Sequence, residues 1–342
     1  MWWLVILRVK KPRKNQNERG AITVLTAVCL VALLFVVALV VNVGISYAEK
    51  SQLQNGADAA ALAVANKCAE RATTTPCQAG TIPADLQVLA NSLVDSNSND
   101  GSSSVLLEMG TGVVTATTST VSSDGAKIIL PISGVNATVR AVAAASWGGP
   151  SGGPAAFPIT FSDCQFNLSG AVQLLQIHMT DAAHECGRGP SGLIIPGGFG
   201  WLNQDPGQCQ ATINLNAGGG MVGGDTGNNA PKNCDAVLNG WIAKINAGKQ
   251  VIVLLPVYDG ATGNGANTIF HIRGFAAFQV LGWRFPGSSP NSFNNTGNSP
   301  SSLNCSGNCS GIIGKFIEFT TVDSAFPPGG QDLGAHVIGL TR

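Results

Sequence analysis

The longest uninterrupted apolar run lies near the beginning of the chain. No charged residue occurs from Ala21 to Ala48, and the core of this segment reads AITVLTAVCLVALLFVVALVV. A helix needs about 20 apolar residues to cross the hydrocarbon core of a bilayer. The pattern therefore predicts a transmembrane anchor over residues 20–48.

The charges around this run predict its orientation. Six basic residues and one acid precede it, and Glu49 is the first charge after it. Basic residues are retained on the cytoplasmic side of a membrane. We therefore expect residues 1–19 to form a cytoplasmic basic segment and the chain beyond the anchor to be extracytoplasmic.

Two other interpretations of the run are less favoured. A cleaved signal peptide has an apolar region of about 7–15 residues, and this run is longer, which favours an uncleaved signal anchor. A type IV prepilin would have a Gly before its cleavage site and a Glu at the fifth position after it. Arg19-Gly20 resembles the first feature, but Leu25 stands at the fifth position, which argues against processing as a pilin subunit.

Helical residue types continue beyond the run, through an alanine-rich stretch that ends near residue 66. Gly56 is the weak point, at a cost of about 1 kcal/mol relative to Ala. Alanine side chains are small, so a partner helix could approach this stretch closely. A plain stalk would show the same residues, and the sequence leaves both interpretations open.

The later pattern predicts two extracytoplasmic units. ADLQVLANSLV is helical in type and is followed by strand-like runs, with a hairpin signal at Asp124-Gly125, so residues 49–146 are expected to form a small α+β unit. The Gly/Pro-rich residues 147–156 have no periodicity, which predicts a linker. Residues 157–342 have mostly strand patterns, with a helical pattern near CDAVLNGWIAKIN and a polar insertion at 286–304. The expected fold class is α+β: a transmembrane helix continuing into an extracytoplasmic helix with a small sheet, then a mainly β, disulfide-stapled domain.

Composition supports an extracytoplasmic location. Only 11% of residues are charged, and no Lys/Arg-rich face is visible beyond the first segment, so nucleic-acid binding is not predicted. Cys29 lies inside the apolar run, and eight cysteines follow it, an even number that predicts disulfides. Sequence proximity favours Cys68–Cys77 and Cys305–Cys309, although eight cysteines permit 105 pairings. The other four cysteines are Cys164, Cys186, Cys209 and Cys234.

Three stretches contain residue types that bind metals, and each has a simpler explanation. His178, Asp181, His184 and Glu185 lie close together, but their spacing is not the H-E-x-x-H of a zinc helix. DGATGNGAN at 259–267 resembles a calcium loop, yet Asp259 is its only acid, and calcium prefers several oxygen ligands. The CxxxC of Cys305 and Cys309 favours a small disulfide loop. We therefore predict no catalytic residue, no metal site and no cofactor.

The segment from residue 18 to residue 66 resembles the N-terminal part of the Flp pilus-assembly TadE/TadG-like family. The family has an Arg-Gly before its span, a Gly and an aromatic residue near the end of the span, and a Leu-Gln followed by an Asp-Ala-Ala-Ala block. The matching residues here are Arg19, Gly20, Gly44, Tyr47, Leu53, Gln54, Ala57, Asp58, Ala59, Ala60 and Ala61. Asn42 stands where the family often has Asp. PGGFGWL at 196–202, Pro256–Asp259 and HIRGFAAFQVLGW at 271–283 also resemble a Gly-rich actinobacterial branch of the family.

This resemblance implies a membrane-anchored component of the Tad apparatus that assembles Flp pili, and it implies no chemistry. The expected protein is non-enzymatic, resides in the cell membrane with a single span, and contacts other Tad membrane proteins or the pilin, and possibly the cell wall. A membrane-tethered extracellular binding or adhesion module unrelated to pili would explain the β pattern, the linker and the cysteines equally well. A secreted hydrolase is the least favoured hypothesis, because no nucleophile–base set stands out.

Overall fold

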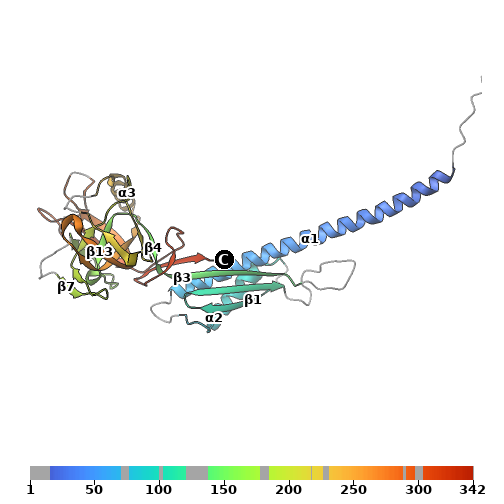
Figure 1. Cartoon of the computed structure of the whole chain (residues 1–342), viewed down its shortest axis with the longest axis horizontal. Helices are drawn as coiled ribbons and strands as arrows, with labels where there is room; N and C mark the ends of the chain where they lie inside the picture. Colours follow the sequence, from blue (N-terminus) through green and yellow to red (C-terminus); the bar gives the residue numbers. More distant parts are fainter. Residues whose placement is uncertain are drawn as a thin grey trace, which may run out of the picture.

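The computed structural model describes residues 16–70, 77–99, 103–120, 138–177, 185–216, 218–225, 231–287, 290–296 and 303–341. Figure 1 shows a long helix that projects from a small α/β unit, which adjoins a larger β-rich unit at the opposite end of the molecule. The fold is α+β, as predicted.

Helix α1 (Gln16–Glu70) is the longest element of the molecule. Its 55 residues correspond to a length of about 80 Å at 1.5 Å per residue. The predicted anchor and the predicted extracytoplasmic helix are therefore one continuous helix. Because no proline occurs between its ends, nothing in the sequence forces a break where the apolar run stops.

The small unit consists of a sheet with two helices against it. Its strands run in the order β1-β2-β3-β18-β16, and β17 also pairs with β3. The last part of α1 and helix α2 supply Ala60, Ala61, Leu86 and Val94 to a core that also contains Val114. The remaining bounds in this unit are α2 (Ala84–Asn97), β1 (Ser103–Gly110), β2 (Val113–Thr120), β3 (Arg140–Pro150), β16 (Phe319–Thr321), β17 (Pro328–Gly330) and β18 (Ala335–Leu340).

The β-rich unit is built around the long antiparallel pair of β12 (Val251–Thr262) and β13 (Ile269–Arg284). Its main sheet has the order β6-β15-β13-β12-β5-β9, and β11 and β14 pair with β13. The other bounds are β4 (Gly152–Ala155), β5 (Ile159–Ser162), β6 (Gln173–Gln176), β7 (Glu185–Arg188), β8 (Ile194–Pro196), β9 (Phe199–Trp201), β10 (Ala211–Asn214), β11 (Met221–Gly223), α3 (Asp235–Asn246), β14 (Ser292–Phe293) and β15 (Gly311–Ile317). Three short 3-10 turns complete the described elements, at Asp163–Gln165, Gly218–Gly220 and Gly265–Asn267.

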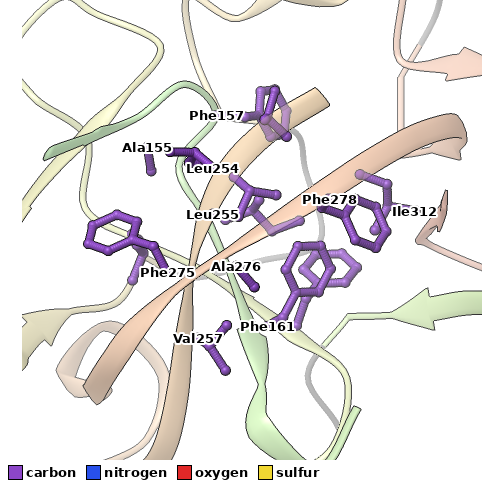
Figure 2. Packing of buried hydrophobic residues seen from close by; sticks show 14 of the residues in the cluster. Ala155, Phe157, Phe161, Leu254, Leu255, Val257, Phe275, Ala276, Phe278 and Ile312 are labelled. Atoms are coloured by element: carbon purple, nitrogen blue, oxygen red, sulfur yellow. The ribbon is translucent and has the colours of Figure 1, made fainter. Parts of the chain in front are cut away.

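Aromatic side chains fill the core of this unit (Figure 2). Phe161 stacks on Phe278, with ring centroids 4.7 Å apart, and meets Phe316 edge to face at 5.4 Å. All three side chains are fully buried. The mostly buried strands β5, β13 and β15 therefore converge on one apolar interior.

The Gly/Pro segment 147–156, which we predicted as a linker, consists mainly of strand. It contains the end of β3 and all of β4, and its glycines permit close backbone approach. A Cβ on Gly149 would lie 1.9 Å from the carbonyl oxygen of Gln331, and one on Gly330 would lie 2.0 Å from that of Pro150. Glycine here reflects tight packing of β3 against β17 (Pro328–Gly330), not flexibility.

The last strands of the chain also depart from the predicted boundary at residue 157. Strand β18 pairs with β3 through Val337–Leu340, and β16 pairs with β18. Residues 319–340 therefore complete the small sheet, and the β-rich unit is inserted between β3 and β16 (Figure 1). Local patterns cannot show a pairing between residues nearly 200 positions apart. The predicted hairpin at Asp124-Gly125 lies outside the described residues.

Candidate functional site

The first half of α1 is an exposed apolar rod. Leu33 is 64% exposed and Phe35 52%, and nearly every large side chain between Ile22 and Val43 is similarly bare. By length and composition this is a helix able to cross a membrane, and none of its most apolar window is buried inside the molecule. Water would solvate such a surface poorly, so the helix is a candidate membrane anchor.

The first residues of the family pattern lie on this exposed part. A Cβ added to Gly20 or Gly44 would contact nothing within 4 Å. Tyr47 is 77% exposed, at the point where the apolar run ends, and Arg19 belongs to the first turns of α1. The structure therefore gives Gly20, Gly44 and Tyr47 no role inside the folded units, which leaves them available to a membrane or to a partner.

The next residues of the pattern fasten α1 to the sheet. Leu53 is buried, and its carbonyl oxygen accepts a 2.9 Å hydrogen bond from the Thr118 hydroxyl on β2. The Gln54 amide donates to the Asp58 carboxylate at 2.8 Å and to the Val142 carbonyl on β3 at 3.2 Å. Leu-Gln and Asp, one helical turn apart, thus set the position of the helix on the sheet.

The alanine block is the inner face of this helix. Ala57, Ala60, Ala61 and Ala65 have no exposed surface, whereas Ala59 is only partly buried. Their partners in the same core are small residues of the strands and one face of α2, namely Ala116, Ala143, Ala145, Leu86, Ala90 and Val94. The close contact with a partner helix, which the sequence left open, is therefore made within the chain, by α2.

The close approach of α1 to α2 explains why glycine stands at position 56 in the helix. A Cβ on Gly56 would meet the Val94 Cα at 3.3 Å. That distance is shorter than ordinary van der Waals contact, so α1 and α2 cross where both side chains are small. The alanine block therefore forms part of the core that holds the small unit together. It is not the plain stalk that the sequence also allowed.

Four disulfides staple the two folded units. They join Cys68 to Cys77, Cys164 to Cys186, Cys209 to Cys234 and Cys305 to Cys309. The first and last are the pairings that sequence proximity favoured. Cys29 is the free cysteine, exposed on the apolar half of α1.

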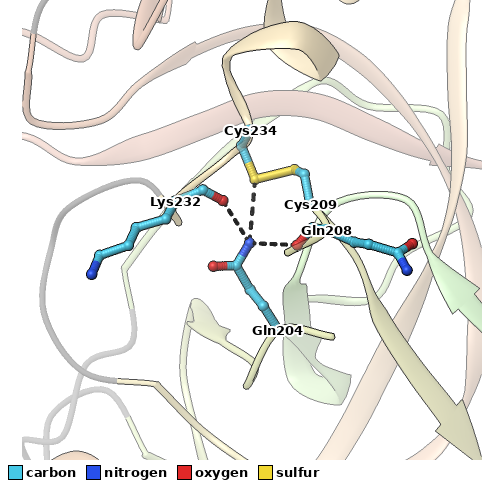
Figure 3. Close-up of a disulfide and its surroundings, with 5 residues drawn as sticks. All are labelled: Gln204, Gln208, Cys209, Lys232 and Cys234. Carbon is cyan, nitrogen blue, oxygen red and sulfur yellow. Dashed lines mark hydrogen bonds between the residues drawn. A yellow bond between two sulfur atoms is a disulfide. The ribbon is translucent and has the colours of Figure 1, made fainter. Parts of the chain in front are cut away.

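The Cys209–Cys234 bond ties the start of α3 to the loop before β10 (Figure 3). The Gln204 amide lies beside it and donates to the carbonyl oxygens of Lys232 at 2.7 Å and Gln208 at 3.0 Å. These bonds hold two loops together that contain no regular secondary structure of their own. The arrangement is structural and offers no reactive thiol.

Polar groups of the β-rich unit are also used within the fold. The buried Asp259 carboxylate pairs with His271 Nδ1, so the acid of the stretch that resembles a calcium loop faces a histidine and not an open cation site. Asp163 binds Arg273 at 2.6 Å. Sequence analysis missed both pairs, because their members are 12 and 110 positions apart and meet only through the pairing of β5, β12 and β13.

Two ionisable groups in this unit have shifted pKa values. Burial raises the pKa of Tyr258, whose hydroxyl donates to the Pro196 carbonyl at 2.8 Å. Partial burial favours the neutral form of Asp205, but hydrogen bonds from Thr212 and Gln210 outweigh it and lower the pKa of that carboxyl. Both groups thus keep their ordinary charge states at neutral pH and act as hydrogen-bonding partners.

The stretch around residues 178–185, which contains residue types that bind metals, lies largely outside the described part of the chain. His178, Asp181 and His184 lie outside the described residues, and Glu185 is the first residue of β7. Within the described ranges, no three His, Cys, Asp or Glu side chains are placed to share a metal ion. The site with the clearest organisation is therefore helix α1, with its exposed apolar first half and its buried alanine face.

Comparison with known proteins points to the same helix. No curated protein and no solved structure matches the chain. One family model does match, over residues 20–67, from the start of the apolar run to the end of the buried alanine face. The description of that model is putative Flp pilus-assembly TadE/G-like, so this segment of the chain is similar to that family.

Proposed function

We propose that this protein is a non-enzymatic, membrane-anchored component of Flp pilus assembly. The observation that carries the proposal is that the matched residues 20–67 form one helix whose two halves have different surfaces. Its first half offers an apolar surface to a bilayer, and its second half is the core of a folded unit. Removing the helix from the membrane would therefore displace everything built on it.

The proposed orientation follows from charge. The six basic residues before the apolar run favour a cytoplasmic location for residues 1–19. The small unit and the β-rich unit then lie outside the membrane, where disulfides form and persist. Their partners would be other membrane proteins of the pilus apparatus, the pilin, or the cell wall.

The test is a gene deletion followed by a count of surface pili. We expect piliation and adhesion to fall and to be restored by the wild-type gene. A gene that encodes Leu33→Arg should restore piliation and adhesion much less. An arginine near the centre of a span costs about 2.5–3.5 kcal/mol on insertion into the membrane. Leu33→Ile is the matched control, since it keeps the side chain apolar at the same exposed position.

Normal piliation in the deletion strain would refute the proposal.

The second candidate function is that of a membrane-tethered binding or adhesion module unrelated to pili. It is favoured by the β-rich unit, which lies wholly outside the matched residues 20–67. Unchanged pili together with lost adhesion would select that candidate, and so would neighbouring genes that encode neither a secretion ATPase nor small pilin-like proteins.

A further inference from the structure

One face of the small sheet is bare over β1, β2 and β3. Helices α1 and α2 cover the opposite face, where Leu107 and Ala116 belong to the core. Side chains alternate between the two faces along each strand, so Leu106 and Val142 point away from the helices, and they are 61% and 36% exposed. Within the described part of the chain, β1 and β2 contact their neighbouring strands and the two helices, and no further element packs extensively on them.

The bare face is flat and carries few charges. Leu106, Thr117 and Val142 lie side by side in one row across the three strands. The solvent-facing side of an antiparallel sheet is ordinarily polar, so this row of short and apolar side chains favours contact with another surface. The other side chains that point the same way include Ser104, Glu108, Val113, Thr115, Ser119, Arg140 and Ala144.

The arrangement of the bare face is self-complementary. Two sheets that pack face to face lie about 10 Å apart, with their strands within about 30° of each other. A second copy can stack on the bare face in this way, with a two-fold axis that runs along the central strand β2. Leu106 of each copy then lies against Val142 of the other, and Thr117 lies on the axis against its own counterpart. A two-fold interface uses the same patch on both copies, and this face meets that requirement.

The charged residues fit the same arrangement. Glu108 on β1 and Arg140 on β3 lie at opposite corners of the bare face. In the stacked pair, Glu108 faces Ala144 of the other copy and Arg140 faces Ser104. Like charges directly opposite each other would destabilise the contact, and here neither charge meets its own counterpart.

The direction of the anchor also favours a second copy. Figure 1 shows α1 leaving the small unit roughly along the direction of β1 and β3. A two-fold axis along β2 therefore directs both anchors into the same membrane. The bare face measures about 14 Å by 23 Å, which is small for a stable complex between free proteins. Two copies anchored in one bilayer need less contact, because the bilayer raises their effective concentration.

We propose that two copies of this protein associate in the membrane through the bare face of β1, β2 and β3. Leu106 and Val142 form two symmetric contacts beside Thr117, and the α1 helices lie on the outside of the pair. The proposal uses the membrane anchor but not the role in pilus assembly. Failure to associate would leave the pilus proposal standing, and normal piliation in the deletion strain would leave this one standing.

Disulfide cross-linking in membranes tests the register. Two differently tagged full-length chains are co-expressed in a Cys29→Ala background, because Cys29 is the free cysteine. One chain carries Leu106→Cys and the other Val142→Cys, and mild oxidation should join them. Within one copy β2 separates the two positions by about 10 Å, which is too far for a disulfide. The control pairs Val142→Cys with Val88→Cys, at a 67% exposed position on α2, and should give at least about tenfold less product.

A charge placed on the axis gives a second test. Thr117→Lys sets two lysines against each other, so this variant should associate at least about tenfold more weakly than wild type. A mixture of Thr117→Lys and Thr117→Glu chains should restore the pair, because opposite charges then meet. Single-molecule photobleaching at low protein density in lipid membranes measures the fraction of dimer. Val88→Lys, on the opposite side of the unit, should leave that fraction unchanged.

The outcomes separate this dimer from other possibilities. A wild-type protein that is monomeric in these membranes would overturn the proposal, and loss of piliation by Thr117→Lys would then assign the bare face to a different membrane protein. A dimer that Thr117→Lys leaves intact would use another surface. A dimer that Thr117→Lys weakens and the mixture with Thr117→Glu fails to restore would contradict the two-fold contact. Cross-linking of Val142→Cys to Val88→Cys as strong as to Leu106→Cys would refute the register.

Discussion

At the scale of residues, the two tyrosines of the chain show how strongly environment decides a role. Tyr47 is 77% exposed on α1, whereas Tyr258 has no exposed surface. The Tyr258 hydroxyl is the donor for the Pro196 carbonyl. Because burial raises the pKa of Tyr258, the group stays protonated and keeps this bond throughout the neutral pH range.

Tyr258→Phe should therefore destabilise the β-rich unit. Removing the donor leaves a buried carbonyl oxygen unpaired, at a cost of about 1–3 kcal/mol in the free energy of unfolding. Denaturant unfolding followed by tryptophan fluorescence measures the change. Tyr47→Phe is the control and should stay within about 0.5 kcal/mol of wild type. Equal effects of the two substitutions would contradict the structural role of Tyr258.

At the scale of elements, α1 combines two kinds of surface in one helix. The hydrophobic residues of its first half face outward on all sides, whereas its second half has a buried stripe of small residues. A helix that is apolar all round belongs in a bilayer, and one with a small-residue face belongs against a sheet or another helix. The change between the two occurs near Tyr47, where the family pattern places its aromatic residue.

Ala60→Leu tests the second half of this helix. Ala60 is fully buried in the core of the small unit, and added methylenes in a packed core cost about 1–3 kcal/mol. We expect a lower midpoint of unfolding for the extramembrane part. Ala48→Leu, at an exposed position of the same helix, should leave that midpoint unchanged. Unaltered stability of Ala60→Leu with lost piliation would instead place the alanine face in an interface with a partner.

At the scale of the whole molecule, β18 joins the two units. Its neighbouring residues face opposite ways: Val337 lies in the core of the β-rich unit and Ile338 in the core of the small unit. The strand also connects β3 to β16. The chain therefore leaves the small sheet through β3 and returns to it through β16–β18, so two strands and not one flexible linker hold the β-rich unit.

This connection predicts that the two units unfold together. Ile338→Ala should cost about 2–5 kcal/mol, and Val337→Ala should lower the same single transition, although each residue lies in a different core. Calorimetry and limited proteolysis of both variants measure this coupling. Removal of Arg342 alone, beyond the end of β18, is the control. Two separate transitions, each sensitive to one variant, would show that the units are independent.

Local sequence determined whatever depends on neighbours along the chain. The apolar run from Ala21 to Ala48 specified a candidate membrane anchor, because its length and composition suffice for a span. Leu53, Gln54 and the alanine block specified the resemblance to the family segment. Cys68–Cys77 and Cys305–Cys309 paired as their proximity suggested.

Tertiary structure decided whatever depends on residues far apart in the chain. The alanine face found its partner in α2 and the strands, the glycines of 147–156 became close contacts, and Asp259 met His271 across two paired strands. The return of β18 to the first sheet arises from the same cause. Strand pairing is set by the register and packing of the whole fold, and a local pattern records only which face of a strand is apolar.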